Sequence, residues 1–257
     1  MYSQSMSAPS FPSYSTILFT FFLFQAGSNT ATMFLIDPKE PAKLKMVGQP
    51  VSTGGEFPVS MAISKQSGQV CILNGGRVNG IKFVATSNAN LLSCLTLSPN
   101  SCFRQDPKLG LLQLDNTQRS LNLNQTTPAN GPAGTVSHVI FNEDGSQLLA
   151  SVKGVPPTPG FIASWDVDSK TGALSTNFTM STPAKGGLLP FSMTVIPGKD
   201  AILNTDAGVG FDILDYKNNK TASSSIVPIS GQKATCWSSF SNKTGNFYLT
   251  VCVAYIF

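Results

Sequence analysis

Apolar positions along this chain come in short runs that turn residues interrupt at nearly every step. The runs are rich in β-branched and aromatic residues, and Gly, Pro, Asn and Asp separate them. Apolar residues rarely recur at the 3.6-residue period of an amphipathic helix beyond one turn. The pattern therefore predicts an all-β protein.

Four units repeat one order: an apolar strand, a turn containing glycine, and a second apolar strand. Their opening strands contain Ile63, Phe141, Val195 and Phe240, which are 78, 54 and 45 residues apart. Four-stranded blades of β-propellers repeat at about 40–50 residues. The first interval approaches that period if residues 83–101, which interrupt the place of a third strand, are set aside.

A third strand with its own turn follows each opening pair, as in residues 102–114, 161–175 and 209–226. Residues 30–47 look like the closing part of an earlier unit. A blade buries both faces against its neighbours, so its strands read as apolar with little strict alternation. We therefore expect an incomplete β-propeller of four-stranded blades, with about three full blades and parts of two more.

The apolar run Tyr14–Ala26 has two interpretations. Its length fits the hydrophobic region of a secretory signal peptide, although no positively charged leader precedes it. It fits a buried strand equally well, because a turn and a second β-rich run follow it. It is too short to predict a transmembrane helix, and no membrane span is expected.

Composition narrows the range of partners. Hydrophobic residues make up 41% of the 257 residues and charged residues only 12%, and the net charge of +4 comes from basic residues scattered singly. Nucleic-acid-binding proteins carry basic stripes or patches, so no nucleic-acid partner is expected. The chain also has no nucleophile elbow, P-loop, zinc-protease motif or dinucleotide fingerprint, and no cofactor is expected.

Four Asn-x-Ser/Thr sequons favour passage through the secretory pathway and N-linked glycans. A composition rich in Asn and Thr would generate some matches by chance. The expected location is extracellular or in the cell wall. The predicted glycosylation sites are Asn124, Asn177, Asn219 and Asn242.

Long stretches of the chain resemble secreted fungal proteins of the carboxymuconate cyclase type, which are seven-bladed propellers related to 6-phosphogluconolactonase-like lactonases. The resemblance covers residues 23–250, whereas residues 1–22, 83–101 and 251–257 have no counterpart. The insert and the tail indicate retained introns or a faulty gene model. An unclosed propeller is expected to fold poorly because it exposes strand edges. The matching stretches are AGSNTATMFLIDPKEP, GGEFPVSMAIS, GQVCILNGGRVNG, NEDGSQLLASVKG, GFIASWDVD, GGLLPFSMTVIPG, TDAGVGFDI and ATCWSSFSNKTGNFYLT.

The resemblance implies a fragment of a lactonase-like propeller related to 3-carboxy-cis,cis-muconate cyclase, a lactonising isomerase. A small carboxylate or lactone would then be its ligand. The alternative is a non-catalytic secreted or cell-wall glycoprotein that binds partners through a propeller face. Whether the chain is an enzyme stays open at this stage.

His138 is the only histidine and the one catalytic candidate. It lies at the start of a predicted inner strand, near where propeller channels bind ligands, but a single histidine there is more often packed or exposed without a catalytic role. In the related lactonases histidines recur one position earlier, where this chain has Val59, Ser137 and Phe191. The acidic loop of the lactonases is replaced by residues 151–160, and no basic residue is predicted to face a channel.

Two smaller sets of residues invite a structural interpretation. Cys71 and Cys102 lie on strands that become neighbours once 83–101 is set aside, so a disulfide and a pair of buried thiols are both compatible with the sequence. Asp206 and Asp212 flank a glycine-containing turn, where they cap the backbone or hold a cation. The turn role is the more common one.

Overall fold

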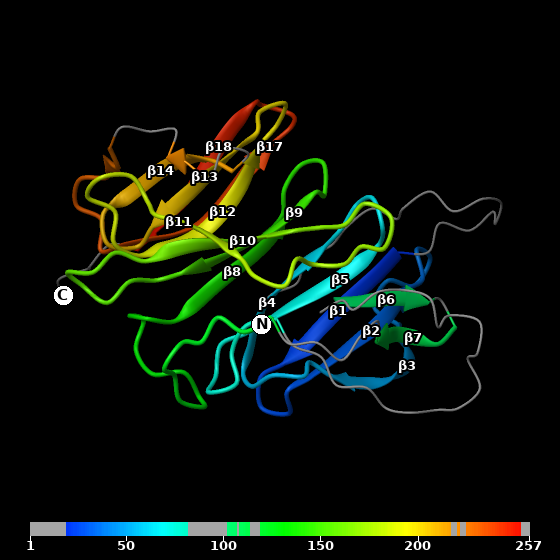
Figure 1. Ribbon diagram of the computed structural model, residues 1–257. Coiled ribbons are helices and arrows are strands. Elements are labelled where there is room, and N and C mark those ends of the chain that lie inside the picture. Colours follow the sequence, from blue (N-terminus) through cyan, green and yellow to red (C-terminus); the bar gives the residue numbers. More distant parts are fainter. Residues whose placement is uncertain are drawn as a thin grey trace, which may run out of the picture.

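The computed structural model describes residues 19–81, 102–106, 108–113, 119–216, 220–221 and 225–252. These residues form eighteen strands and no helix, which confirms the all-β prediction. Figure 1 shows the sheets following one another in chain order as an open arc, from β1–β3 at one end to β17–β18 at the other. None of the described residues belongs to a helix that is long and apolar enough to cross a membrane.

The first sheet contains three strands in the order β1-β2-β3. The apolar run Tyr14–Ala26, which the sequence allows as a signal peptide or as a strand, contributes β1. This strand begins at Phe19 and pairs antiparallel with β2. The strand crosses the expected boundary between residues 22 and 23. The bounds are Phe19–Gln25, Thr30–Ile36 and Leu44–Ser52.

The second and third sheets are four-stranded blades in which each strand pairs with its neighbour in the chain, and the fourth has a fifth strand, because β15 and β16 both pair with β14. The second sheet contains β4 (Pro58–Ile63), β5 (Gln69–Asn74), β6 (Cys102–Asp106) and β7 (Gly110–Gln113). The third contains β8 (Val136–Phe141), β9 (Gln147–Val152), β10 (Phe161–Asp166) and β11 (Thr179–Ser181). The fourth contains β12 (Pro190–Ile196), β13 (Ala201–Asp206), β14 (Gly210–Asp215), β15 (Lys220–Thr221) and β16 (Val227–Pro228).

The last sheet pairs β17 (Ala234–Ser241) with β18 (Asn246–Cys252). The four predicted opening strands are β4, β8, β12 and β17, and each packs against the next one along the arc. The hairpins that follow β8, β12 and β17 turn at Gly145, Gly198 and Gly245, whose φ angles are 71°, 68° and 71°. Glycine adopts this left-handed conformation without a Cβ penalty, so the sequence positions of these turns were predictable.

Three hydrophobic clusters lie between neighbouring sheets, as the propeller interpretation requires. One joins the first and second sheets through Met33 and Ile72, and a second joins the second and third through Leu73 and the fully buried Trp165. The third joins β9 and β10 to β12 and β13. Because each sheet buries both faces, the strands show little alternation; all six residues of β5 are buried.

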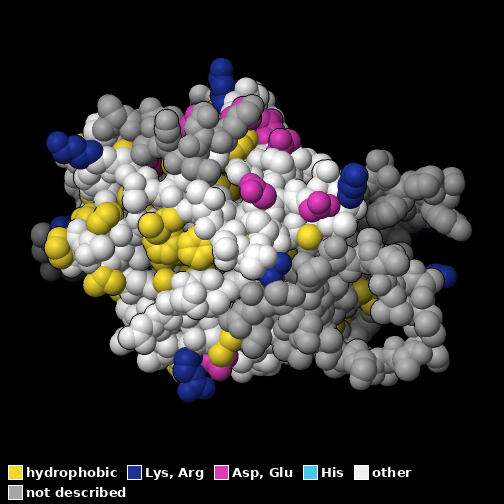
Figure 2. Space-filling model, in the orientation of Figure 1, with side chains coloured by type: hydrophobic (Ala, Val, Ile, Leu, Met, Phe, Trp, Pro, Cys, Tyr) yellow, Lys and Arg dark blue, Asp and Glu magenta, His cyan; other side chains and the backbone are white. Residues whose placement is uncertain are grey.

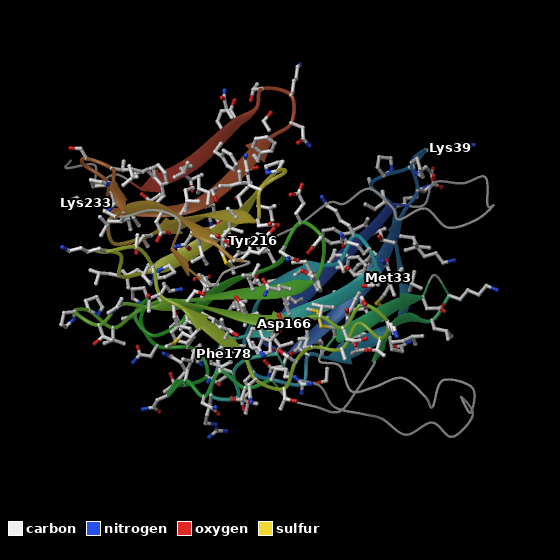
Figure 3. All side chains as sticks on the ribbon, turned by 45° about the horizontal axis from the view of Figure 1, so that its top comes forward. Met33, Lys39, Asp166, Phe178, Tyr216 and Lys233 are labelled. Carbon is white, nitrogen blue, oxygen red and sulfur yellow. A yellow bond between two sulfur atoms is a disulfide. The ribbon has the colours of Figure 1, made fainter. Side chains whose placement is uncertain are left out.

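Most charged side chains lie at the periphery, and the buried ones are Arg119, Lys153, Asp206 and Asp212 among the residues described. Figure 2 shows Lys and Arg scattered singly on the face in view, and no histidine reaches that surface. In Figure 3, Lys39 and Lys233 point away from the sheets on opposite sides of the molecule. The charges that bear on function are therefore the few that lie inside the sheets.

Candidate functional site

One backbone irregularity recurs in the opening strands. The pairing of β8 with β9 shifts between Val136 and Val139, so that two residues, Ser137 and His138, lie opposite the single residue Ser151. The same bulge places Phe191-Ser192 opposite Thr205 and Cys236-Trp237 opposite Thr250. In β4 the shift makes Val59 the extra residue, next to Ser60, which pairs with Leu73. We call the two residues of each pair the first and the second bulge position. Bulges of this kind re-aim side chains and leave backbone groups that need other partners.

In the bulges of β8, β12 and β17, a hydroxyl group on the second strand accepts a hydrogen bond from the backbone N–H of the second bulge residue. The Oγ atom of Ser151 accepts a hydrogen bond from the backbone N–H of His138 at 3.0 Å and donates to the Phe191 carbonyl of the next sheet at 2.7 Å. Thr205 repeats this arrangement: it accepts from Ser192 N–H at 2.9 Å and donates to the Cys236 carbonyl at 2.6 Å. We call these the hydroxyl latches, because each ties one sheet to the next.

A second series of hydrogen bonds between neighbouring sheets explains why the His138 side chain is buried. The residue at the second bulge position accepts a hydrogen bond from the following sheet: the Oγ of Ser60 from Val139 N–H at 3.1 Å, and the Oγ of Ser192 from Ser238 N–H at 3.4 Å. His138 occupies the same position, and its Nδ1 accepts from Met193 N–H at 3.1 Å. The imidazole therefore does what a serine hydroxyl does in the neighbouring sheets.

The environment of His138 keeps the ring neutral. Burial lowers the pKa of His138 to about 4, and the ring packs edge-on against Trp237 with 5.2 Å between centroids. An Nδ1 atom that accepts a bond carries no proton, so the neutral tautomer has its proton on Nε2. A catalytic role for His138 stays a prediction from sequence, and the contacts give the ring a packing role.

Sequence reasoning missed Lys153, which lies at the centre of the site. The segment expected to form a loop from Ser151 onwards begins as strand, because β9 extends to Val152. Lys153 follows it, is only 5% exposed, and donates from Nζ to the Val136 carbonyl at 3.1 Å and to the Ser137 Oγ at 2.9 Å. Lys153 therefore lies against the inner strand β8, while the expectation that no basic residue faces a channel stays a prediction.

Side chains from three sheets meet at this lysine. Its Nζ lies 4.9 Å from the centre of the Phe191 ring, within the range of a cation–π contact. The thiol of Cys236, half-buried on β17, is close enough to influence the pKa of the lysine. We call Ser137, Lys153, Phe191 and Cys236 the lysine cluster. Ser137, Phe191 and Cys236 each occupy the first bulge position of their strand.

The electrostatics of the lysine cluster are unusual. Burial lowers the pKa of Lys153 to about 8, and the proximity of Cys236 opposes that shift. Lys43 and Arg77 pair with Glu40 and Glu56, whereas among the described residues no carboxylate pairs with Lys153. A buried cation without an anionic partner is costly, so its neighbourhood favours an anion or a polarised carbonyl.

The two aspartates serve the backbone. Asp206 is fully buried and accepts bonds from the N–H groups of Leu188, Leu189 and Gly208. Asp212 accepts from Ala184 N–H and from the side-chain amide of Asn204, and burial raises its pKa. These contacts fix the segment that enters β12, which is the turn role. No group of three or more potential metal ligands occurs among the residues described.

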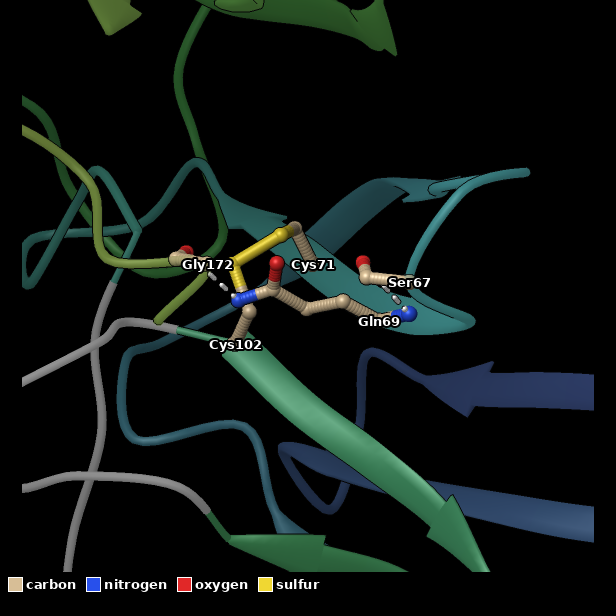
Figure 4. Close-up of a disulfide and its surroundings, with 5 residues drawn as sticks. All are labelled: Ser67, Gln69, Cys71, Cys102 and Gly172. Atoms are coloured by element: carbon tan, nitrogen blue, oxygen red, sulfur yellow. Dashed lines mark hydrogen bonds between the residues drawn. A yellow bond between two sulfur atoms is a disulfide. The ribbon is translucent and has the colours of Figure 1, made fainter. Parts of the chain in front are cut away.

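The structure joins Cys71 and Cys102 in a disulfide, with 4.4 Å between their Cα atoms. The two residues face each other on β5 and β6. The side-chain amide of Gln69, also on β5, donates a hydrogen bond to the carbonyl of Gly172 in the loop between β10 and β11 (Figure 4). The predicted glycosylation sites Asn124, Asn177 and Asn242 are exposed, and Asn219 lies outside the described residues. The insert 83–101 and the tail 253–257 also lie outside them.

Comparisons with known proteins identify the fold. No protein-family model matches the chain, and no curated protein matches it. Among solved structures, the periplasmic gluconolactonase of Pseudomonas aeruginosa is 18% identical, with a TM-score of 0.59 over 89% of this chain and 59% of that one. A gluconolactonase of Xanthomonas campestris is 12% identical, with a TM-score of 0.50 over 91% and 65%.

A protein of Lactobacillus plantarum is 10% identical, with a TM-score of 0.53 over 90% of this chain and 65% of that one. The chain therefore spans about three fifths of the length of these relatives. At such low identity the likeness concerns architecture alone. The chain has the β-propeller fold of the gluconolactonase-like proteins, present here as an incomplete set of blades.

Proposed function

We propose that this chain is part of a lactonase-like propeller that binds a small carboxylate, or the corresponding lactone, beside Lys153. The observation that carries the proposal is the buried ammonium group of Lys153, which has polar neutral partners and no carboxylate partner among the described residues. A carboxylate ligand would supply the missing negative charge, and a lactone carbonyl would accept one of its N–H bonds.

The finer proposal is a relation to 3-carboxy-cis,cis-muconate cyclase. Its support is the sequence resemblance described above, and the substrate of such a cyclase is a polycarboxylate that closes to a lactone. Lys153 would provide one cationic contact for that substrate. The ammonium group also has a proton to donate, which a lactonising isomerase needs at the carbon next to the forming ring.

A second candidate is a non-catalytic, secreted or cell-wall glycoprotein that binds partners through a propeller face. The observation that favours it is the set of side chains at the first bulge positions, none of which is an imidazole or a carboxylate: Val59, Ser137, Phe191 and Cys236. The exposed sequon asparagines and the disulfide support secretion in both cases. Enzymatic removal of N-glycans from protein expressed in a eukaryotic host tests the glycosylation directly, through a mass shift.

Titration calorimetry on the full chain tests the binding proposal. The ligands are 3-carboxy-cis,cis-muconate, gluconate and glucono-δ-lactone, and the variants are Lys153→Met and, as a control, the exposed Lys170→Met. We expect Lys153→Met to weaken carboxylate binding about tenfold or more, because it removes a charge-assisted bond, and Lys170→Met to leave it unchanged. Equal binding by wild type and Lys153→Met would contradict the proposal. Binding without turnover of any ligand would favour the glycoprotein.

A further inference from the structure

We propose that Ser137 is a nucleophile and Lys153 its general base, so that the lysine cluster opens lactones and esters by transferring the acyl group to serine. The inference deepens the proposed function, because a lactone bound beside Lys153 brings its carbonyl carbon to the neighbouring serine. Pairs of serine and lysine that act in this way are known on unrelated folds. They are recognised by geometry, so the argument starts from distances.

The geometry meets the first requirement of a nucleophile and its base. The Nζ of Lys153 and the Oγ of Ser137 are 2.9 Å apart, within the range needed for proton transfer. The Val136 carbonyl holds the amine in place from the other side. The Oγ of Ser151 lies 3.3 Å from the Ser137 Oγ, and the Ser137 hydroxyl also lies within 3.5 Å of the Pro190 carbonyl oxygen.

The bulge makes the position of Ser137 rigid. The Ser151 hydroxyl accepts a hydrogen bond from the N–H of His138, the residue after Ser137 on β8, and donates one to the Phe191 carbonyl in the next sheet. Ser137 and Lys153 are 7% and 5% exposed, whereas Phe191 and Cys236 beside them are half-buried. A substrate would therefore reach the serine from the side of Phe191 and Cys236.

The chemistry of the lysine suits a base. Burial lowers the pKa of Lys153 to about 8, so roughly a tenth of the amine is neutral at pH 7 and half of it at pH 8. The titratable group that faces it from β17 is the thiol of Cys236, while the ring of His138 on β8 points to Met193. Serine attack is thus expected to speed up with pH through the titration of Lys153.

The proposed reaction balances without any cofactor. The neutral Nζ takes the proton of the Ser137 hydroxyl as Oγ attacks the lactone carbonyl carbon. The ring C–O bond breaks, and the leaving oxygen takes the proton from the ammonium group, which leaves a hydroxyacyl ester on Ser137. Water then gives a proton to Nζ and attacks the ester, and Oγ leaves with that proton. The net change is lactone plus water to hydroxy acid.

Covalent labelling of the full chain tests this inference. A fluorophosphonate probe is added to wild type, Ser137→Ala, Lys153→Met and the control Ser239→Ala, which changes an exposed serine of β17. We expect one adduct per wild-type chain on the peptide containing Ser137, with a rate that rises with an apparent pKa near 8. The adduct should be absent in Ser137→Ala, about a hundredfold slower in Lys153→Met, and unchanged in Ser239→Ala.

The outcomes separate this inference from the binding proposal. Folded wild type that forms no adduct, or forms it at another residue, would overturn the nucleophile. Peptide mapping of wild type and the Lys153→Met rate decide the question even where Ser137→Ala fails to fold. Calorimetry with gluconate on wild type and Lys153→Met tests the carboxylate site without any covalent step. A failed nucleophile therefore leaves weaker gluconate binding by Lys153→Met standing, whereas equal binding by the two proteins overturns the carboxylate site.

Discussion

The bulges of β8 and β12 have the same backbone and carry different chemistry. Both place two residues opposite one hydroxyl residue, and both use that hydroxyl to reach the next sheet. The β8 bulge holds Ser137-His138 with Lys153 beyond the latch, whereas the β12 bulge holds Phe191-Ser192 with Ala207 at the place of the lysine. The backbones agree there too, since the N–H groups of Lys153 and Ala207 bond to the carbonyls of Thr135 and Leu189.

The comparison shows that the bulge has two separate roles, which are to join neighbouring sheets and to present side chains for chemistry. The latch needs a hydroxyl on the second strand and a hydrogen-bond acceptor at the second bulge position, and serine and neutral histidine both satisfy that need. At the first bulge position the latch uses only the backbone carbonyl, as at Phe191 and Cys236, and it does not use the residue after the second strand. Chemistry in this propeller is therefore free to vary at Ser137 and Lys153 without loss of the joint between the sheets.

The hydroxyl latches should show the largest effect. Ser151→Ala removes partners from both His138 N–H and the Phe191 carbonyl, and Thr205→Val does the same to Ser192 N–H and the Cys236 carbonyl. Leaving two such groups unsatisfied should lower the free energy of unfolding by about 4 kcal/mol in each variant. Urea denaturation measures it, with Ser239→Ala as the control. A large loss in one variant and none in the other would break the equivalence of the two bulges.

The acceptors at the second bulge positions of β8 and β12, His138 and Ser192, should differ in how their contribution to stability changes at low pH. The pKa of His138 is about 4 in the folded chain and 6.5 when unfolded, so between these values the unfolded state binds the extra proton. The contribution of neutral His138 to the free energy of unfolding, about 3 kcal/mol, is complete above pH 6.5 and is lost as pH falls towards 4. His138→Ser keeps an acceptor, as in β12, and should remove this part of the pH dependence of urea unfolding. A variant with the wild-type slope would rule out His138 as its source.

Lys153 should lower the free energy of unfolding, whereas Ala207, at the corresponding position of the next sheet, should not. Its pKa of about 8 lies below the unfolded value of 10.5, so at pH 7 both states are charged and the folded state bears the cost of a buried cation. Lys153→Met should raise the free energy of unfolding by about 2 kcal/mol after the loss of two hydrogen bonds. In wild type the same group should add stability as pH rises from 8 to 10.5. Lower stability in Lys153→Met than in Lys170→Met would contradict a costly functional lysine.

The sequence predicted the repeat but not the site. Opening strands around Ile63, Phe141, Val195 and Phe240 were predictable because apolar runs and glycine turns mark them locally. The role of His138 was also visible in principle, since aligning the four strands puts it in one column with Ser60 and Ser192. Lys153 was not predictable, because its contact with Ser137 depends on a bulge that shifts the register by one residue.

The smallest expected effect compares the acceptors Ser60 and Ser192. Ser60→Ala leaves the N–H of Val139 without its partner, and Val139 is fully buried, so unfolding free energy should fall by about 1 kcal/mol. Ser192→Ala affects Ser238 N–H, whose bond is longer at 3.4 Å and whose residue is half-buried, so water replaces the hydroxyl and the loss should be about 0.5 kcal/mol. Urea denaturation of both variants, each against Ser239→Ala, measures the difference. A larger loss for Ser192→Ala would mean that the joint to β17 is the tighter one, and that the open end of the arc is held as firmly as its interior.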